Sequence, residues 1–182
     1  AADFQGRSQL GVVEAERLTG DDEAADALGR CQLAVDAGHD LAVLVLIHPA
    51  MGDRVRAHAV EALGPLAGRH VWDLYAGIGE TTVALAQGGA SVESVESDRR
   101  AVDEAERRGP PVRRHAARVE HVLAELRAPE LVVTNPPRTG MDARVAAALE
   151  RLRPRRVVYV SCDPATLARD LTRLPGYDLT DV

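Results

Sequence analysis

A cysteine followed by an aspartate and a proline stands near the end of the chain, in Ser161-Cys162-Asp163-Pro164-Ala165-Thr166. Asp is a frequent N-cap and Pro is favoured at the first helical position, so this run predicts a helix that begins directly after Cys162. The apolar run 157–160 predicts a strand before it. A thiol between a strand's end and a helix's start is favoured as the thiolate, which is the nucleophilic form. A lone cysteine is more commonly a small buried hydrophobe, so this interpretation depends on its neighbours.

A glycine turn follows another apolar strand, in Asp73-Leu74-Tyr75-Ala76-Gly77-Ile78-Gly79-Glu80. Gly77 and Gly79 lack a Cβ and let a ligand approach the backbone closely. Glu96 ends the next predicted strand, 17 residues after Gly79, where a carboxylate is able to hold the two hydroxyls of a ribose. The turn lacks the third glycine of the dinucleotide fingerprint, which disfavours a pyrophosphate cofactor. For Glu80, an ordinary acid at a helix start is a comparable explanation.

The segment Thr134-Asn135-Pro136-Pro137-Arg138 ends a third apolar strand. Its two prolines stop the strand and hold Asn135 at the edge of the sheet, beside the expected cofactor. In amino-methyltransferases the related Asn-Pro-Pro motif is followed by an aromatic residue that stacks on the base. Arg138 takes that place here, which argues against methylation of an amine.

Strand and helix patterns alternate with short connections from Val71 onward, which predicts a parallel sheet covered by helices on both faces. Upstream, a turn-prone segment between the apolar runs 33–35 and 41–47 predicts a hairpin, with a helix at 51–63 after it. The fold class is therefore α/β, with a doubly wound, mostly parallel, Rossmann-like sheet. We expect strands at 71–75, 91–96, 112–115, 131–134, 157–160 and from 177, and helices at 80–87, 98–108, 119–126, 143–152 and 164–174.

Two families are recognisable in these motifs. The glycine turn with Glu96 resembles class I S-adenosylmethionine methyltransferases. Within that class, residues 135–140 (NPPRTG) and 158–170 (VYVSCDPATLARD) resemble the RNA 5-methyluridine methyltransferases, which act on ribosomal and transfer RNA. The resemblance covers about Val71 to Val182, with 48–50 just before it. It implies S-adenosylmethionine as cofactor, an RNA substrate, Cys162 as nucleophile, and cofactor contacts from the glycine turn and strand ends, namely Asp73, Tyr75, Gly77, Gly79, Glu80, Glu96 and Asn135.

The chemistry of uracil explains the need for such a cysteine. Carbon 5 is too weak a nucleophile to accept a methyl group unaided, but addition of a thiolate at carbon 6 gives an enolate that is able to. A base must then remove the carbon 5 proton so that the cysteine leaves.

The sequence departs from the family at several points. Family enzymes continue with a Phe-Pro strand pair and a His-Val-Glu segment that carries the base, whereas this chain ends at Val182. We therefore expect this chain, taken alone, to lack the final strand pair, to bind S-adenosylmethionine weakly and to turn over poorly. The family's Phe-x-Gln, whose glutamine touches the cofactor, is replaced by a stretch containing Val45 and Leu46. The N-terminal barrel and four-cysteine iron–sulfur site of some members are not encoded, because Cys31 alone cannot hold a cluster.

Charge and composition bound the other functions. The net charge of −6 argues against indiscriminate coating of nucleic acid, although 99–156 holds 14 arginines against 8 acids. No apolar run approaches the roughly 20 residues of a membrane span, and the first residues lack the basic start and apolar stretch of a signal peptide, so we expect a cytoplasmic protein and no membrane partner. With only Cys31 and Cys162, far apart, no disulfide framework, metal site or zinc site is expected. We expect a monomer.

Two domains and three functions follow as hypotheses. Residues 1–63 form an N-terminal extension of acidic segment, hairpin and helix, interpreted as the remnant of a substrate-recognition domain, and residues 64–182 form the S-adenosylmethionine-binding domain. The leading function is methylation of carbon 5 of a uridine in RNA. The alternatives are a class I methyltransferase of a small molecule or protein in which Cys162 is structural, and a non-catalytic cofactor-binding or RNA-binding fragment.

Overall fold

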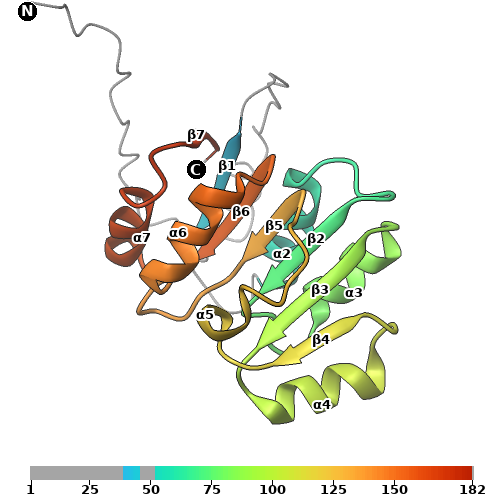
Figure 1. Ribbon diagram of the computed structural model, residues 1–182. Coiled ribbons are helices and arrows are strands. Elements are labelled where there is room, and N and C mark those ends of the chain that lie inside the picture. Colours follow the sequence, from blue (N-terminus) through green and yellow to red (C-terminus); the bar gives the residue numbers. More distant parts are fainter. Residues whose placement is uncertain (1–38, 46–51, 182) are drawn as a thin grey trace, which may run out of the picture. The chain divides into compact units, whose positions relative to one another are not determined.

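One parallel sheet organises the part of the chain that the computed structural model describes, residues 39–45 and 52–181 (Figure 1). Its strand order is β4-β3-β2-β5-β6-β1-β7, and every neighbouring pair runs parallel. The strands are β1 (Asp40–Val45), β2 (His70–Leu74), β3 (Ser91–Glu96), β4 (Arg113–Ala116), β5 (Leu131–Thr134), β6 (Arg156–Ser161) and β7 (Asp178–Asp181). The expected α/β class is confirmed.

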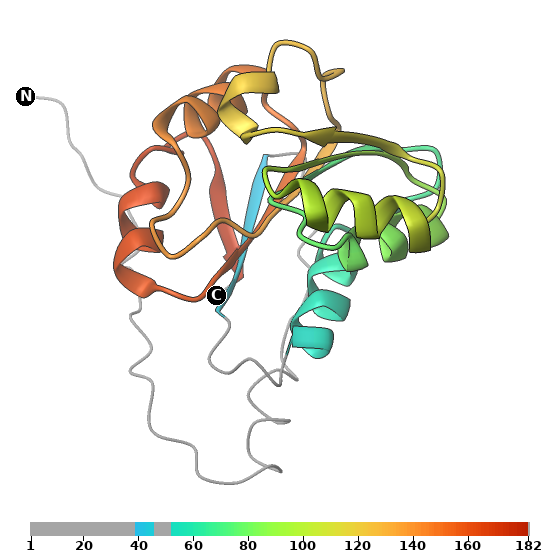
Figure 2. The same cartoon turned by 90° about the horizontal axis from the view of Figure 1, so that it is seen from below.

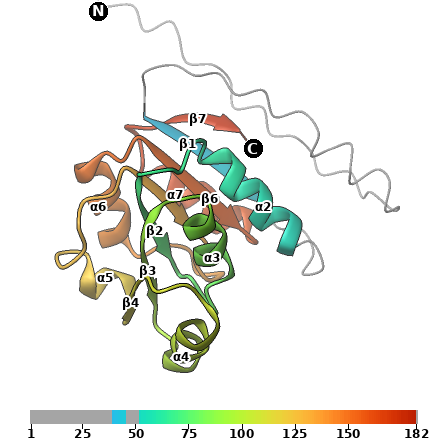
Figure 3. The ribbon, with the colours of Figure 1, turned by 90° about the vertical axis from the view of Figure 1, so that its right-hand side faces the viewer.

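Two hydrophobic cores form because successive side chains of a strand point to opposite faces of the sheet. In β6, Val157 and Tyr159 enter one core, whereas Val158 and Val160 enter the other. The helices are α2 (Gly52–Ala62), α3 (Glu80–Gln87), α4 (Arg99–Arg108), α5 (Val119–Val122), α6 (Ala143–Leu152) and α7 (Pro164–Leu171). Helices α5, α6 and α7 supply the first core and α2 and α3 the second, on opposite sides of the sheet (Figure 3). The sheet is therefore doubly wound.

The order of the strands reverses between β2 and β5. From β2 the chain runs outward through β3 to β4, and it then returns to β5 on the other side of β2. Figure 2 shows these two halves as the green-to-yellow and the orange-to-red parts of the ribbon. In open α/β sheets ligands bind beyond the carboxyl ends of the strands at such a reversal, so the loops after β2, β3 and β5 are the place to look for a site.

Strand β1 corrects the hairpin prediction. Both of its edges are occupied by strands from the other end of the chain, since Asp40 pairs in register with Arg156 of β6 and with Asp178 of β7. The Arg156 guanidinium donates to Oδ2 of Asp40 at 2.7 Å and to the carbonyl of Ala62 at 2.9 Å, which fixes β1 and the end of α2 together. The predicted partner run 33–35 and residues 1–29, Cys31 and 48–50 lie outside the described residues. Thus β1 and α2 share one sheet and core with residues 64–181, although residues 1–63 are predicted from the sequence to be an extension.

The start of α7 has the predicted capping chemistry, and the start of α4 is capped in the same way. Asp98 accepts a hydrogen bond from the backbone N–H of Arg100 at 2.9 Å, and Asp163 accepts one from Thr166 at 2.9 Å, with Pro164 in the first turn of α7. Helices α3 and α6 have the predicted bounds, whereas α5 and α7 end earlier than expected, at Val122 and Leu171. The caps place α7 directly after Cys162.

Candidate cofactor and reaction site

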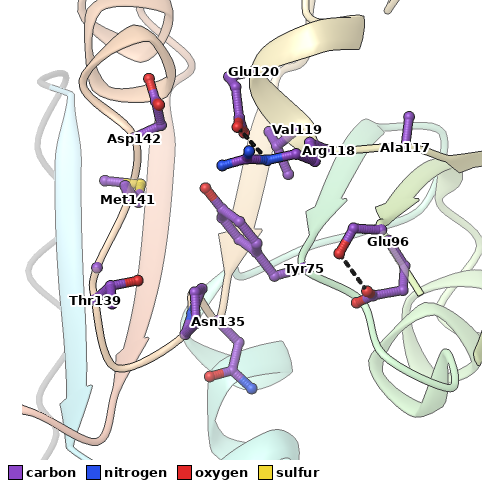
Figure 4. A pocket seen from close by; sticks show the side chains of 13 residues that line it. Tyr75, Glu96, Ala117, Arg118, Val119, Glu120, Asn135, Thr139, Met141 and Asp142 are labelled. Atoms are coloured by element: carbon purple, nitrogen blue, oxygen red, sulfur yellow. Dashed lines mark hydrogen bonds and ion pairs between the residues drawn. The ribbon is translucent and has the colours of Figure 1, made fainter.

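A cavity of about 540 Å³ opens at the carboxyl edge of the sheet, beside the reversal of strand order (Figure 4). Its walls come from the loops that follow β2, β3, β4 and β5. The lining residues are Tyr75, Glu96, Ser97, Ala117, Arg118, Val119, Glu120, Asn135, Pro137, Thr139, Gly140, Met141 and Asp142. Three of the predicted cofactor residues, Tyr75, Glu96 and Asn135, thus lie together around one space.

Glu96 is held in a fixed orientation at this cavity. Its Oε2 accepts the backbone N–H of Gly77 at 2.9 Å, and its Oε1 accepts the backbone N–H of Asp98 at 2.7 Å and the hydroxyl of Ser97 at 3.1 Å. Three of the roughly four acceptor positions of the carboxylate are thus used, and Oε2 retains a further one. The side chain is therefore preorganised as an acceptor of hydroxyl donors.

The glycine turn adopts a backbone that side chains disfavour. Gly77 has φ of 56° and Gly79 has φ of 81°, both in the left-handed region. A Cβ added to Gly79 would lie 3.0 Å from the Cβ of Ala105 in α4, so this glycine allows close helix packing. A Cβ added to Gly77 would meet no atom within 4 Å. Neither glycine lines the cavity. Helix packing explains why a glycine is needed at position 79, but it does not explain the glycine at position 77.

Asp73 lies beneath the turn. Its side chain is buried, and Oδ2 accepts the hydroxyl of Thr82 at 2.5 Å. Burial raises the pKa of Asp73 to about 7, against the opposing effect of the Thr82 hydrogen bond. Asp73 is not one of the residues that line the cavity, and its hydrogen bond to Thr82 supports the turn, so its predicted contact with a cofactor stays a prediction.

Tyr75 projects into the cavity from an unusual backbone. Its φ of 61° is left-handed for a residue other than glycine, and such strain is commonly retained at functional sites. Figure 4 shows its ring between Glu96 on one side and the segment from Thr139 to Asp142 on the other. Burial raises the pKa of the Tyr75 hydroxyl to about 12, so the phenol stays protonated and is a hydrogen-bond donor at neutral pH.

Glu80 does not contribute to the lining of the cavity. It is exposed at the first position of α3 and forms an ion pair with Arg56 of α2. Asn135, in contrast, lies at the cavity directly after β5, and its backbone N–H donates to the carbonyl of Leu74 at 3.2 Å. That bond continues the β2–β5 ladder to the mouth, where Pro136 and Pro137 end it.

Cys162 is exposed as a free thiol at the carboxyl end of β6, next to β5. The following turn is ordered, since Ser161 Oγ accepts the backbone N–H of Asp163 at 3.2 Å and donates to the Asp163 carbonyl at 3.0 Å. Hydrogen bonding from the Thr166 backbone lowers the pKa of Asp163, with a smaller contribution from Arg138. Cys162 is thus accessible and on the same edge as the cavity, but it is not one of the residues that line it.

The far wall of the cavity was not foreseen from the sequence. Arg118 precedes α5 and Glu120 lies in its first turn, and their side chains pair at 2.7 Å. Arg144 also approaches Glu120, at 3.8 Å, and donates to Asp142. The side chain of Glu120 is only 3% exposed, so a buried carboxylate balanced by arginines stands at this end of the site.

Within residues 39–45 and 52–181, no helix has the length and apolar content to span a bilayer. In the same residues, no group of three or more His, Cys, Asp or Glu side chains is arranged to hold a metal ion.

Comparison with known proteins agrees with the motifs. Residues 111–178 match the family described as tRNA (Uracil-5-)-methyltransferase. An uncharacterized RNA methyltransferase of Nitratidesulfovibrio vulgaris is 34% identical over 180 residues, which cover 90% of this chain and 37% of the relative. A 23S rRNA (uracil(747)-C(5))-methyltransferase of Vibrio cholerae is 30% identical over 141 residues, 74% of this chain and 38% of the relative. The chain therefore spans little more than a third of the length of these relatives.

Solved structures agree with both fold and motif. A Pyrococcus abyssi tRNA (uracil-54, C5)-methyltransferase in complex with S-adenosyl-L-homocysteine superimposes with a TM-score of 0.57 at 30% identity, over 65% of this chain and 31% of that one. A precorrin-6y C5,15-methyltransferase of Geobacter metallireducens has a TM-score of 0.58 at 19% identity, over 67% of this chain and 68% of that one, and indicates a shared fold. The expected resemblance to RNA uracil-C5 methyltransferases is confirmed.

Proposed function

We propose that this chain, a relative of the RNA uracil-C5 methyltransferases, provides the S-adenosylmethionine site and the nucleophile of an enzyme that methylates carbon 5 of a uridine in RNA. The observation that carries the proposal is the position of Cys162: an exposed thiol at the end of β6, on the edge where the end of β5 lines the cavity. A buried cysteine would have favoured a structural role.

The cavity fits the proposed cofactor on chemical grounds. S-adenosylmethionine, when bound, supplies an electrophilic methyl group on a sulfonium. Glu96 is fixed by two backbone N–H groups and has an acceptor position left on Oε2 for a ribose hydroxyl. The open space at Gly77 is available to the ligand, since a side chain there would meet no protein atom. Tyr75 and Asn135 would line the methionine end, while Asp73, Gly79 and Glu80 act through the turn and the start of α3.

Cys162 performs the covalent step in this proposal. Its thiolate adds to carbon 6 of the uracil ring, which forms the S–C bond and moves the ring electrons toward the oxygen at carbon 4 as an enolate. Carbon 5 then takes the methyl group that the sulfonium supplies, with the neutral thioether S-adenosylhomocysteine as the leaving group. Transfer of the carbon 5 proton to a base restores the double bond as the S–C bond breaks, which frees the cysteine as thiolate. The ordered 161–163 turn and the start of α7 hold the thiol at the end of β6 for this first step.

An RNA substrate is supported by the relatives, which are named for RNA, and by the residue after the two prolines. Arg138 is exposed at the mouth and close enough to Asp163 to lower the pKa of that carboxyl. A guanidinium there suits phosphate or a base edge rather than the stacking of an amine-bearing base. Ribosomal and transfer RNA are the two substrate classes, and a cytoplasmic monomer is the proposed working form.

Covalent trapping tests the proposal directly. The 182-residue chain is incubated with S-adenosylmethionine and with tRNA or rRNA fragments that contain 5-fluorouracil, and adducts are resolved on a denaturing gel. Because fluorine at carbon 5 is not released as a cation, the methylated adduct accumulates. Wild type and Cys31→Ser, the matched thiol control, are expected to form the adduct, and Cys162→Ala is expected to form none.

Calorimetric titration with S-adenosylhomocysteine accompanies the trapping and separates the alternatives. Cys162→Ala should retain the affinity of wild type within about twofold, because the thiol does not line the cavity. Methyl transfer by Cys162→Ala to any acceptor would favour a small-molecule or protein methyltransferase. Absence of saturable binding by wild type would favour a non-catalytic fragment.

A further inference from the structure

Asp170 of α7 is a charged residue with no exposed surface, and it lies outside the site described above. Its Oδ2 accepts the backbone N–H of Met141 at 2.6 Å and the hydroxyl of Tyr159 at 2.9 Å. Its Oδ1 accepts from Arg169 and from Arg173, at 2.8 Å and 3.1 Å. A buried carboxylate with this many donors is fully satisfied, so its removal would leave several unpaired groups.

The bond to Met141 connects Asp170 to the cavity, because Thr139, Gly140 and Met141 are part of its wall. The same segment is held by two more bonds from α7: Arg169 donates to the Thr139 carbonyl at 2.7 Å, and Arg173 donates to the Met141 carbonyl at 3.3 Å. A side chain at position 140 would collide with Arg169 and Asp170, so the contact depends on glycine there. One wall of the cavity is thus fastened to α7.

The bond to Tyr159 connects Asp170 to the strand that bears the thiol. Tyr159 lies in β6, three residues before Cys162, and α7 begins two residues after it. The exposed cysteine therefore lies between β6 and α7, which Asp170 joins, and among the hydrogen bonds of the described residues the segment 139–141 reaches β6 only through Asp170. Packed elements of this kind shift as units rather than deforming continuously.

We propose that Asp170 is a positioning residue that couples occupation of the cavity to the reactivity of Cys162. Through its hydrogen bonds, a shift of the Gly140–Met141 wall moves β6 and α7. Filling of the cofactor site therefore changes the position of the Cys162 thiol and its rate of reaction. The inference rests on the proposed function for the identity of the ligand, and it adds a residue and a coupling that the reaction chemistry alone does not require.

Thiol alkylation with and without ligand measures this coupling. In a Cys31→Ser background, the rate of Cys162 carboxamidomethylation by iodoacetamide is measured without ligand and with saturating S-adenosylhomocysteine. Tyr159→Phe removes one donor to Asp170, and Tyr177→Phe is the matched control, since its buried hydroxyl donates to the Leu149 carbonyl of α6 at 3.1 Å and not to Asp170. Asp170→Asn is measured as well wherever it folds.

The ratio of the two rates is the readout that a purely structural role would leave unchanged. In the Cys31→Ser parent and in Tyr177→Phe we expect the ligand to change the rate by about fivefold or more, and in Tyr159→Phe we expect the ratio to fall to about one. A parental ratio retained by Tyr159→Phe, or a parental ratio of one despite calorimetric binding, would overturn the inference. Failure of the parent to bind the ligand at all would overturn the proposed function too, and calorimetry reveals that case before any alkylation.

Discussion

The backbone N–H of Gly77 and Oε2 of Glu96 are joined by a 2.9 Å hydrogen bond between the loop after β2 and the end of β3. Gly77 adopts a left-handed backbone here, with φ of 56°. The bond holds the acid at the mouth of the cavity and leaves one acceptor position of Oε2 free. Turn and acid, which are 19 residues apart, therefore act as one binding element.

Replacement of this acid should weaken cofactor binding without unfolding the chain. Glu96→Gln keeps the size of the side chain but offers one acceptor oxygen instead of two, so the hydrogen bonds to Gly77, Asp98 and ribose cannot all be made. We expect the dissociation constant for S-adenosylhomocysteine to rise by about 10-fold to 100-fold, measured by calorimetry. Glu106→Gln on α4 is the control, and equal losses in both variants would contradict the assignment.

The buried acid beneath the turn predicts a pH-dependent stability. Burial raises the pKa of Asp73 to about 7, so in the folded state it holds a proton that the unfolded chain releases near pH 4. The folded state binds more protons between these values, and stability must therefore fall as pH rises through that window. The upper limit of the loss is about 4 kcal/mol, since one pKa unit corresponds to about 1.4 kcal/mol.

Asp73→Asn isolates this contribution, because the amide oxygen still accepts the Thr82 hydroxyl but does not ionise. Urea unfolding at pH 5 and pH 8 should show a smaller loss for the variant than for wild type. Parallel pH profiles for the two proteins would mean that Asp73 is already ionised in the fold at pH 5.

Local patterns suffice for the elements nearest the site and fail for contacts between distant segments. β5 and α3 have the predicted bounds because an apolar tetrapeptide before two prolines, and a helix before two glycines, are punctuated by residues that end them. The place of β1 could not be read locally, because it depends on partners such as Arg156, 116 residues away from Asp40. A hairpin is the nearest local explanation of the same pattern, and it is wrong for this strand.

The residues that line the cavity also differ in how well the sequence predicts them. Glu96 and Asn135 are predictable because they end strands, and strand ends of a parallel sheet share one edge. Arg118, Glu120 and the segment 139–142 reach the cavity only through tertiary contacts, for example the bond between Met141 and Asp170, which are 29 residues apart. For the segment 139–142, the sequence offers one indication of a role at the site, namely that Thr139 and Gly140 belong to the family motif at 135–140.

The ion pair that fastens β1 should contribute measurably to stability. Asp40 and Arg156 have side chains only 10% and 11% exposed, so Asp40→Ala would leave a guanidinium largely buried with one partner fewer. We expect a loss of about 3 kcal/mol in urea unfolding, as for other pairs broken on one side. Asp103→Ala, which breaks the exposed pair with Arg99, should cost less than about 0.5 kcal/mol beyond its effect on helix propensity. A loss for Asp40→Ala no larger than that of Asp103→Ala would indicate that β1 leaves the sheet readily.

Replacement of Gly140 or Gly77 by alanine should have different effects, although both glycines have a left-handed backbone. At Gly140, with φ of 78°, a methyl group collides with Arg169 and Asp170 in addition to straining the backbone, so Gly140→Ala should lose about 3 kcal/mol of stability. At Gly77 the space is open, and only backbone strain of about 1 kcal/mol is expected. In the proposed function the cofactor extends from the cavity over this turn, so Gly77→Ala should weaken S-adenosylhomocysteine binding by about 10-fold or more while losing less stability than Gly140→Ala. If Gly77→Ala binds the ligand normally, the cofactor does not approach the turn, and the placement of its methionine end beside Tyr75 has to be given up.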